Sequence, residues 1–118
     1  MYARHSIGQE GEEIATKYLI ENNYAIIERN FNCRQGEIDI IAKDKKEFVF
    51  IEVKTRTNRK YGNPAEAVAT SKVKHLLKSI EYYLFLNKLE NSFIRIDVIE
   101  VYKKEDKFYI NHIKNAID

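Results

Sequence analysis

Three residues in the middle of the chain have side chains and a spacing that suit metal-dependent phosphodiester chemistry. Asp39 lies in the apolar run 36-GEIDIIA-42, and Glu52 and Lys54 lie in the run 47-EFVFIEVKTR-56. Mg²⁺ prefers hard oxygen ligands such as carboxylates, and a nearby lysine can hold a water molecule or neutralise charge on phosphoryl oxygens. Charge inside apolar strands is costly unless it is compensated, and a divalent cation would compensate it.

A hairpin formed by these two runs would bring the acids together. Paired positions in a hairpin have a constant sum of residue numbers, and a turn centred on residues 45–46 gives a sum of 91. Asp39 then lies opposite Glu52, and Glu37 lies opposite Lys54, with all four on one face. The other face would carry Ile38, Ile40, Val49, Ile51 and Val53. The prediction requires an even loop, because a three-residue loop would put the two acids on opposite faces.

The same four charged side chains also fit an ordinary solvated sheet face. Cross-strand ion pairs on such a face each contribute about 0.2–1 kcal/mol. The spacing D-x(12)-E-x-K does not separate the two interpretations, because so short a pattern often occurs by chance. On spacing alone, both remain open.

Two helices are predicted around these strands. Ser6 and Gln9 form a capping-box pattern at the start of an apolar stripe over residues 7–19. A second helix is signalled by Pro64, with a further start at residues 70–71 and an apolar stripe that continues to about Asn87. Glu12 lies at the edge of the first stripe, where it could overlook the charged face of the sheet.

Strand patterns complete an α/β domain with the order α-β-β-β-α-β-β. The predicted strands span residues 24–31, 36–42, 47–56, 93–102 and 107–113. The first three follow one another as a meander, and the last two form a hairpin. We therefore expect a central mixed sheet of about five strands with flanking helices.

Length and composition limit the remaining possibilities. The 118 residues are 44% hydrophobic, which predicts a single domain over residues 1–118 with one real core. A lone Cys33 excludes an internal disulfide and fits a reducing compartment. The first residues have no apolar signal region and no later run approaches the length of a membrane span, so we expect a cytoplasmic protein without membrane contact.

Basic residues gather in one part of the chain although the net charge is only +2. Residues 54–78 hold seven Lys or Arg against one Glu, a local charge of +6. Such a segment beside carboxylates suits a phosphate-rich partner, although a solvated loop and helix face would look the same. The candidate phosphate contacts are Arg34, Arg56, Arg59, Lys60 and Lys72.

Five ordered fragments carry a resemblance to a known family. They are G-x-x-G-E-x-x-A-x-x-Y-L at 8–19, N-x-x-C-R-x-G-E-I-D-I-I-A at 30–42, F-I-E-V-K-x-R at 50–56, Y-G-x-P-x-E-A-V at 61–68 and R-I-D-V-I at 95–99. The chain resembles the PD-(D/E)xK restriction-endonuclease-like nucleases, and more narrowly the YraN family, which is similar to archaeal Holliday-junction resolvases. Fragments in this order cover nearly the whole chain.

The resemblance implies a restriction-endonuclease-like fold and a nuclease that uses Mg²⁺ or Mn²⁺. By position it implies that Asp39 and Glu52 bind the metal, that Lys54 is the active-site lysine and that Glu12 is an additional acid. Ile38 stands where the broad superfamily has the proline that names it. Nucleic acid is the implied partner, with DNA favoured over RNA; structured or branched DNA is one possible substrate, and a homodimer is one arrangement that would supply two sites for cutting two strands.

Two functions of another class compete with this one. The run 48-FVFIEV-53 resembles the aromatic strand on which an RNA-recognition module stacks bases. That module begins with a strand, whereas this chain begins with a helix, and Asp39 and Glu52 would place negative charge on the RNA platform. The second alternative is a degenerate nuclease fold that serves as a scaffold or as a DNA-binding partner.

Overall fold

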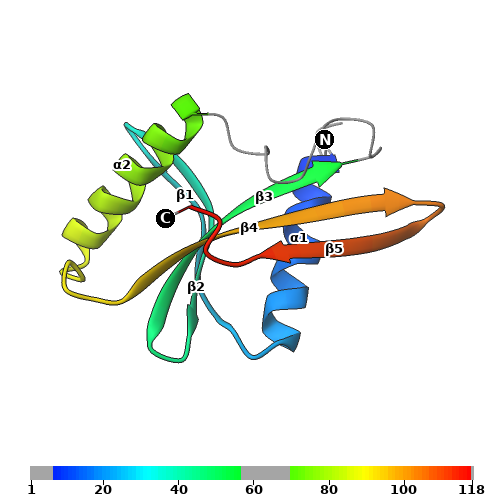
Figure 1. Ribbon diagram of the computed structural model, residues 1–118, viewed down its shortest axis with the longest axis horizontal. Helices are drawn as coiled ribbons and strands as arrows, with labels where there is room; N and C mark the ends of the chain where they lie inside the picture. The colour runs from blue at the N-terminus through cyan, green and yellow to red at the C-terminus, as the bar shows by residue number, and fades with distance from the viewer. Residues whose placement is uncertain (1–6, 57–69, 118) are drawn as a thin grey trace.

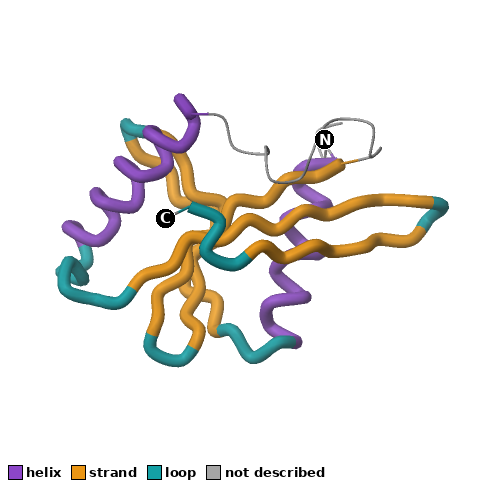
Figure 2. Tube along the Cα trace, viewed as in Figure 1, coloured by secondary structure: helices purple, strands orange, loops and turns teal. Residues whose placement is uncertain are grey.

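The predicted order of helices and strands is confirmed by a computed structural model, which describes residues 7–56 and 70–117 (Figures 1 and 2). The elements are α1 (Ile7–Glu21), β1 (Ala25–Cys33), β2 (Gly36–Asp44), β3 (Glu47–Arg56), α2 (Thr70–Leu86), β4 (Ile94–Lys104) and β5 (Lys107–Ile113). Every strand lies within two residues of its predicted bounds. Ser6, Arg59, Lys60 and Pro64 lie outside the described residues.

The strands form one mixed sheet in the order β1-β2-β3-β4-β5. Neighbouring strands are antiparallel except β3 and β4, which are parallel. The parallel pair requires a crossover between β3 and β4, and α2 lies within that connection. The first three strands form the predicted meander, and the prediction of a five-stranded mixed sheet is confirmed.

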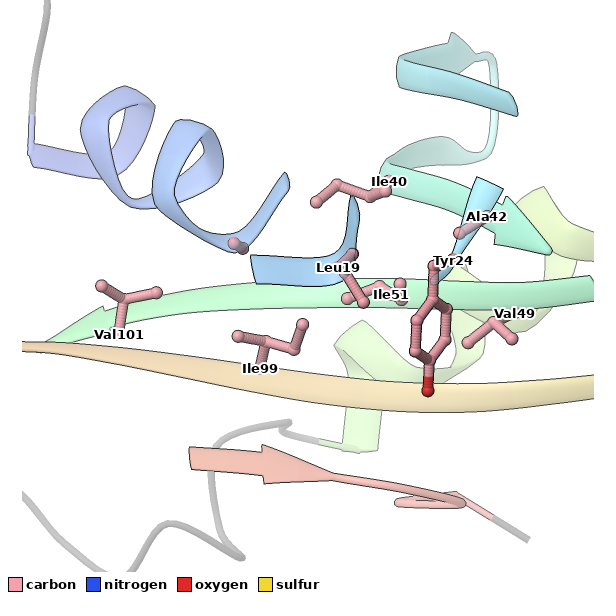
Figure 3. Close-up of a cluster of buried hydrophobic side chains, with 9 residues drawn as sticks. Leu19, Tyr24, Ile40, Ala42, Val49, Ile51, Ile99 and Val101 are labelled. Carbon is pink, nitrogen blue, oxygen red and sulfur yellow. The ribbon is translucent and has the colours of Figure 1, made fainter. Parts of the chain in front are cut away.

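The helices cover opposite faces of the sheet, because alternate strand residues pack against different helices. Ala15 and Leu19 of α1 belong to a cluster with Ile40, Ala42, Val49, Ile51, Ile99 and Val101 (Figure 3). Leu76, Ile80 and Tyr83 of α2 belong to a second cluster with Ile38, Ile41, Phe50 and Ile96. Burying each large side chain stabilises the fold by about 1.5–3 kcal/mol, so both helices are held firmly on the sheet. Neither described helix has the length and hydrophobicity needed to cross a membrane.

The predicted register of the β2–β3 hairpin is confirmed over five pairs, whereas the predicted pairs of Asp39 with Glu52 and of Glu37 with Lys54 lie beyond the observed ladder. A two-residue turn at 45–46 joins the strands, and the pairs run from Asp44 opposite Glu47 to Ile40 opposite Ile51. Each pair sums to 91, as expected for an even loop. The register brings the ends of β2 and β3 that carry the candidate acids to the same part of the sheet.

The strands part immediately beyond Ile40 and Ile51, which is where the simple alternation of faces fails. The next backbone amide of the ladder, Val53 N, donates to the Asp39 carboxylate at 2.8 Å. Ile38 was predicted to share a face with Ile40, but it packs in the α2 cluster on the other face. The prediction for Ile38 is wrong because Asp39 replaces a backbone partner and interrupts the regular pleat.

A buried arginine fastens the β2–β3 turn to the centre of the sheet. Arg95 on β4 pairs with Asp97 through Nε at 3.0 Å, and its Nη1 reaches Asp44 at 3.1 Å and Glu47 at 3.0 Å. Its Nη2 donates to the Tyr24 hydroxyl at 2.8 Å. Because buried charges are tolerated only when paired, this network holds the closed end of the hairpin while the other end opens.

Candidate functional site

A cavity of about 980 Å³ lies where β2 and β3 separate. Both helices contribute to its walls, as do the open ends of both strands and the β1–β2 turn at residues 34–35. Its charged and titratable lining consists of Glu12, Arg34, Glu37, Asp39, Glu52, Lys54, Lys72 and His75. The cavity therefore gathers acids and bases from segments that are far apart in the chain.

Three carboxylates converge in this cavity. One oxygen from each of Glu12, Glu37 and Asp39 lies within 4.8 Å of the others. Asp39 is only 9% exposed, whereas Glu37 is exposed at the cavity mouth. Such a group of hard oxygen donors is chemically suited to a divalent cation that keeps part of its water shell.

Glycine at position 11 allows α1 to approach β3 closely enough to bring Glu12 into this group. A Cβ atom on Gly11 would collide with the Thr55 hydroxyl of β3. A side chain at position 11 would therefore push the helix outward, and Glu12 with it. The close approach of backbones is a position where glycine is needed for its small size.

Glu52 lines the same cavity but does not belong to the three-carboxylate group. Its Oε2 lies 2.7 Å from Lys72 Nζ and 3.4 Å from Lys54 Nζ. Glu52 is 5% exposed, so two ammonium groups compensate a nearly buried carboxylate. Lys72 was predicted to be a phosphate contact; its side chain is half exposed and reaches from α2 across the cavity.

Asp39 is the carboxylate whose charged form is most disfavoured by its surroundings among the described residues. Burial raises the pKa of Asp39 to about 7, and the nearby charges of Glu52, Glu12 and Glu37 act in the same direction against the Val53 hydrogen bond. Burial also raises the pKa of Glu12, with Arg29 opposing and Glu37 adding to the effect. Like charges held this closely favour either a bound proton or a bound cation.

The two lysines have opposite environments. Burial lowers the pKa of Lys54, and the adjacent Lys72 lowers it further, whereas Glu52 opposes both effects. For Lys72, burial is outweighed by the contact with Glu52, so the pKa of Lys72 is raised. Lys54 is therefore the more easily deprotonated of the pair.

Of the sequence candidates, the structure brings Glu12, Arg34, Asp39, Glu52, Lys54 and Lys72 to one cavity. Arg56 ends β3 and does not line it, and Arg59 and Lys60 lie outside the described residues. Sequence reasoning did not assign a ligand role to Glu37, although its position two residues before Asp39 was the signal. His75 was also missed, although it follows Lys72 by three residues on the same helix.

Comparison with known proteins identifies the family. A family model described as "Uncharacterised protein family UPF0102" matches residues 11–101. The chain belongs to the UPF0102 family. This is the family that the sequence motifs indicated under the name YraN.

Relatives of nearly equal length support this membership. A UPF0102 protein of Caldicellulosiruptor saccharolyticus is 44% identical over 115 residues, covering 96% of this chain and 98% of the relative. A UPF0102 protein of Clostridioides difficile is 47% identical over 109 residues, covering 92% of this chain and 94% of the relative. UPF0102 similarity therefore extends over the whole α/β domain.

Two solved structures resemble the chain more distantly. SSO0001 is 24% identical with a TM-score of 0.38, and Pyrococcus furiosus SfsA in complex with Ca²⁺ is 13% identical with a TM-score of 0.41. They cover 95% and 92% of this UPF0102 chain, which spans 52% and 62% of theirs. Because both TM-scores are below 0.5, neither likeness adds to the assignment of the site.

Proposed function

We propose that this UPF0102 protein is a metal-dependent nuclease that hydrolyses phosphodiester bonds, with DNA as its substrate. The observation that carries the proposal is the convergence of Glu12, Glu37 and Asp39 beside Lys54 in an open cavity. Carboxylates at this separation repel one another unless a cation or a proton lies between them. A cavity of this size leaves room for a phosphate group next to them.

The donor set fits Mg²⁺ or Mn²⁺. Glu12, Glu37 and Asp39 would hold the ion, and Glu52 lies close enough to raise the pKa of Asp39 through its charge. When bound, such an ion polarises a phosphoryl oxygen and lowers the pKa of a coordinated water molecule. All donors are oxygens, which favours these hard cations over zinc.

The remaining side chains would position the substrate. Lys54 lies on the cavity wall beside Glu52, where its ammonium can hold the attacking water or stabilise charge on the phosphoryl oxygens. Arg34 is exposed at the rim and offers a fork of donors to a neighbouring phosphate. Lys72 would compensate Glu52 from the α2 side of the cavity.

Cleavage of a DNA panel with Mn²⁺ tests the proposal. Linear single-stranded, linear double-stranded, nicked and branched substrates are incubated with wild type, Asp39→Asn and Lys54→Ala. We expect both variants to lose at least about a hundredfold in rate, the loss typical when a key electrostatic group is removed. Equal cutting by all three proteins would identify a contaminating nuclease and contradict the proposal.

A matched pair of glutamates controls for general effects on α1. Glu12→Gln should lose cleavage because Glu12 belongs to the three-carboxylate group. Glu13→Gln alters the adjacent acid, which pairs on the surface with Arg29 at 3.3 Å. We expect Glu13→Gln to cleave within about twofold of wild type, since exposed ion pairs contribute little.

One observation favours a second candidate, a nucleic-acid-binding protein without catalysis. Glu52 is already compensated by Lys72 at 2.7 Å, so one expected metal ligand is engaged elsewhere. Calorimetric titration with Mn²⁺ separates the candidates. Binding that disappears in Asp39→Ala favours the nuclease, whereas DNA affinity without any metal binding favours the binding protein.

A further inference from the structure

We infer that an aromatic surface beside the cavity binds unpaired nucleobases, so the substrate carries a single-stranded segment next to the bond that is cut. The inference rests on the proposed function and names its substrate class. The surface, called here the base shelf, consists of Arg34, Gln35, Lys78, Tyr82, Phe85 and Leu86. It joins the β1–β2 turn to the outer side of α2, which lie side by side in Figures 1 and 2.

Two shallow hollows on the base shelf have suitable size and chemistry. The first, about 410 Å³, lies between the β1–β2 turn and the side chains of Tyr82 and Leu86. The second, about 440 Å³, is lined by Lys78, Tyr82 and Phe85 together with Gln35 and Glu81. Tyr82 and Gln35 belong to both hollows, so the two form one continuous surface.

The apolar side chains of the base shelf are unusually open to water. Phe85 is 65% exposed, Leu86 is 50% exposed and Tyr82 is 39% exposed. The Tyr82 ring packs against Phe31 with ring centroids 6.4 Å apart, so it is supported from below. Stacking of one base on an exposed aromatic ring contributes about 1–3 kcal/mol and does not depend on sequence.

Charge on the base shelf favours nucleic acid over a second copy of this chain. From α2 the two hollows are lined by Lys78 against Glu81, and with Arg34 from the turn their lining has a net charge of +1. Arg34 and Lys78 are both exposed to solvent. Arg34 in the first hollow and Lys78 in the second can each pair with a phosphate of a bound strand, whereas a second copy of the shelf would bring the same positive net charge.

The base shelf is continuous with the proposed catalytic cavity. Asn32, Cys33, Arg34 and Gln35 line both the cavity of about 980 Å³ and the first hollow. The buried Oε1 of Gln35 has no hydrogen-bond partner among the described residues, so no hydrogen bond to this oxygen holds the side-chain amide in one orientation. A strand with one phosphate at the acidic cluster would place its neighbouring bases over Tyr82. Base faces inside a duplex are already stacked, so only unpaired bases can bind this way.

A single fluorescent reporter tests the inference directly, because the chain contains no tryptophan. Phe85→Trp is made in an Asp39→Asn background, so that oligonucleotides stay intact in Mg²⁺. The protein is titrated with a single-stranded 12-mer of dT, an abasic 12-mer of equal charge and a 12-base-pair duplex. We expect the dT strand to quench the fluorescence and to bind about tenfold more tightly than the abasic strand.

Alanine variants in the same background separate base stacking from general surface effects. Tyr82→Ala should weaken binding of the dT strand about fivefold to tenfold and leave binding of the abasic strand unchanged. Tyr109→Ala is the matched control, because Tyr109 is 51% exposed on β5 and lines none of these hollows. It should change neither affinity.

Three results would overturn the inference. The first is equal affinity for the dT and abasic strands. The second is tighter binding of the duplex than of the dT strand, with a preference that Tyr82→Ala does not change. The third is a wild-type dimer that Phe85→Ala converts to a monomer, as measured by light scattering. The last result would assign the shelf to self-association. If the dT strand binds more tightly than the abasic strand but wild type cleaves no substrate, the nuclease proposal fails and the base shelf stands. If wild type cleaves DNA but binds the dT and abasic strands equally, the nuclease proposal stands and the base shelf fails.

Discussion

Asp39 combines a structural and a chemical role in one carboxylate. It accepts the Val53 amide at 2.8 Å where the β2–β3 ladder ends, and it contributes an oxygen to the three-carboxylate group. The first role needs only an acceptor, whereas the second benefits from negative charge. Replacement by asparagine therefore separates the two roles.

The raised pKa of Asp39 makes a stability prediction. A pKa of about 7 in the folded protein, against the ordinary 3.8, means that the fold holds this proton more tightly than the unfolded chain. The resulting stabilisation is complete below the ordinary pKa and is lost as pH rises through about 7. Without metal at pH 8, Asp39→Asn should therefore be more stable than wild type by about 1–3 kcal/mol in urea unfolding.

The pH dependence gives this prediction a control. At pH 4 the Asp39 carboxyl is protonated in the folded protein, so the difference between the variants should shrink to less than about 0.5 kcal/mol. A constant difference at both pH values would show that the variant acts through packing rather than charge.

Cation binding should reverse the order of stability. Glu12, Glu37 and Asp39 repel one another in the folded protein, so a bound Mn²⁺ should stabilise wild type by about 2.7 kcal/mol at a hundred times its Kd. Differential scanning fluorimetry with and without Mn²⁺ measures the shift. Glu12→Gln and Asp39→Asn should lose most of it, and Glu13→Gln should retain it. A shift that survives in Asp39→Asn would place the ion elsewhere.

Sequence alone brought Asp39 and Glu52 of one hairpin together, but it did not give the contacts that depend on tertiary distance. Asp39 and Glu52 follow from the alternation of strand residues and the even turn. The contact of Lys72 with Glu52 joins α2 to β3 across a long connection, and no local pattern encodes that distance. The grouping of Glu37 with Glu12 likewise depends on how α1 lies on the sheet.

At the scale of the elements, the packing of α1 on β3 determines where Glu12 lies. A methyl group at Gly11 would collide with the Thr55 hydroxyl, so Gly11→Ala should destabilise the protein by about 1–3 kcal/mol. Helix propensity alone would stabilise it by up to about 1 kcal/mol, so the sign of the change is informative. Urea unfolding measures it, and Mn²⁺ affinity should fall because Glu12 moves.

A double variant tests the cause of that destabilisation. Thr55→Ala removes the hydroxyl that the new methyl group would meet, so it should restore part of the stability lost in Gly11→Ala. The interaction energy of the double-mutant cycle should be about 1 kcal/mol or more in favour of the pair. Additive effects would indicate that position 11 matters for another reason.

Periodicity predicted the elements well because most strand residues follow the regular pleat. The register of β2 and β3 is as expected from Asp44 to Ile40, where backbone hydrogen bonds continue. It fails at Ile38, because the Asp39 side chain takes the place of a backbone acceptor. A pattern of alternating residues does not predict that a side chain will replace a backbone acceptor. The replacement occurs in the cavity where the charged side chains meet.

At the scale of the whole molecule, Arg34, Lys54 and Lys72 line the cavity together with its four carboxylates. Nucleic-acid binding by such a surface should weaken with salt, because phosphate contacts release counterions. Arg34→Gln should lower the slope of log affinity against log salt by about 0.7 for a single strand. Fluorescence anisotropy between 50 and 200 mM salt covers a useful range for the measurement.

Lysine at the far hairpin controls for total charge in this experiment. Lys107 is exposed at the start of β5, and this end of the β4–β5 hairpin lies on the opposite side of the molecule from α2 in Figure 1. Lys107→Gln removes the same charge but should leave the slope unchanged. Equal effects of the two variants would mean that DNA is attracted by net charge and not by the rim of the cavity.

Through its short contact with Glu52, the Lys72 ammonium neutralises this carboxylate without a bound ion. A cation that binds Glu52 must displace the Lys72 ammonium, so its binding is an exchange of one cation for another. Competition of this kind raises the ion concentration that is needed to occupy half of the Glu52 carboxylates.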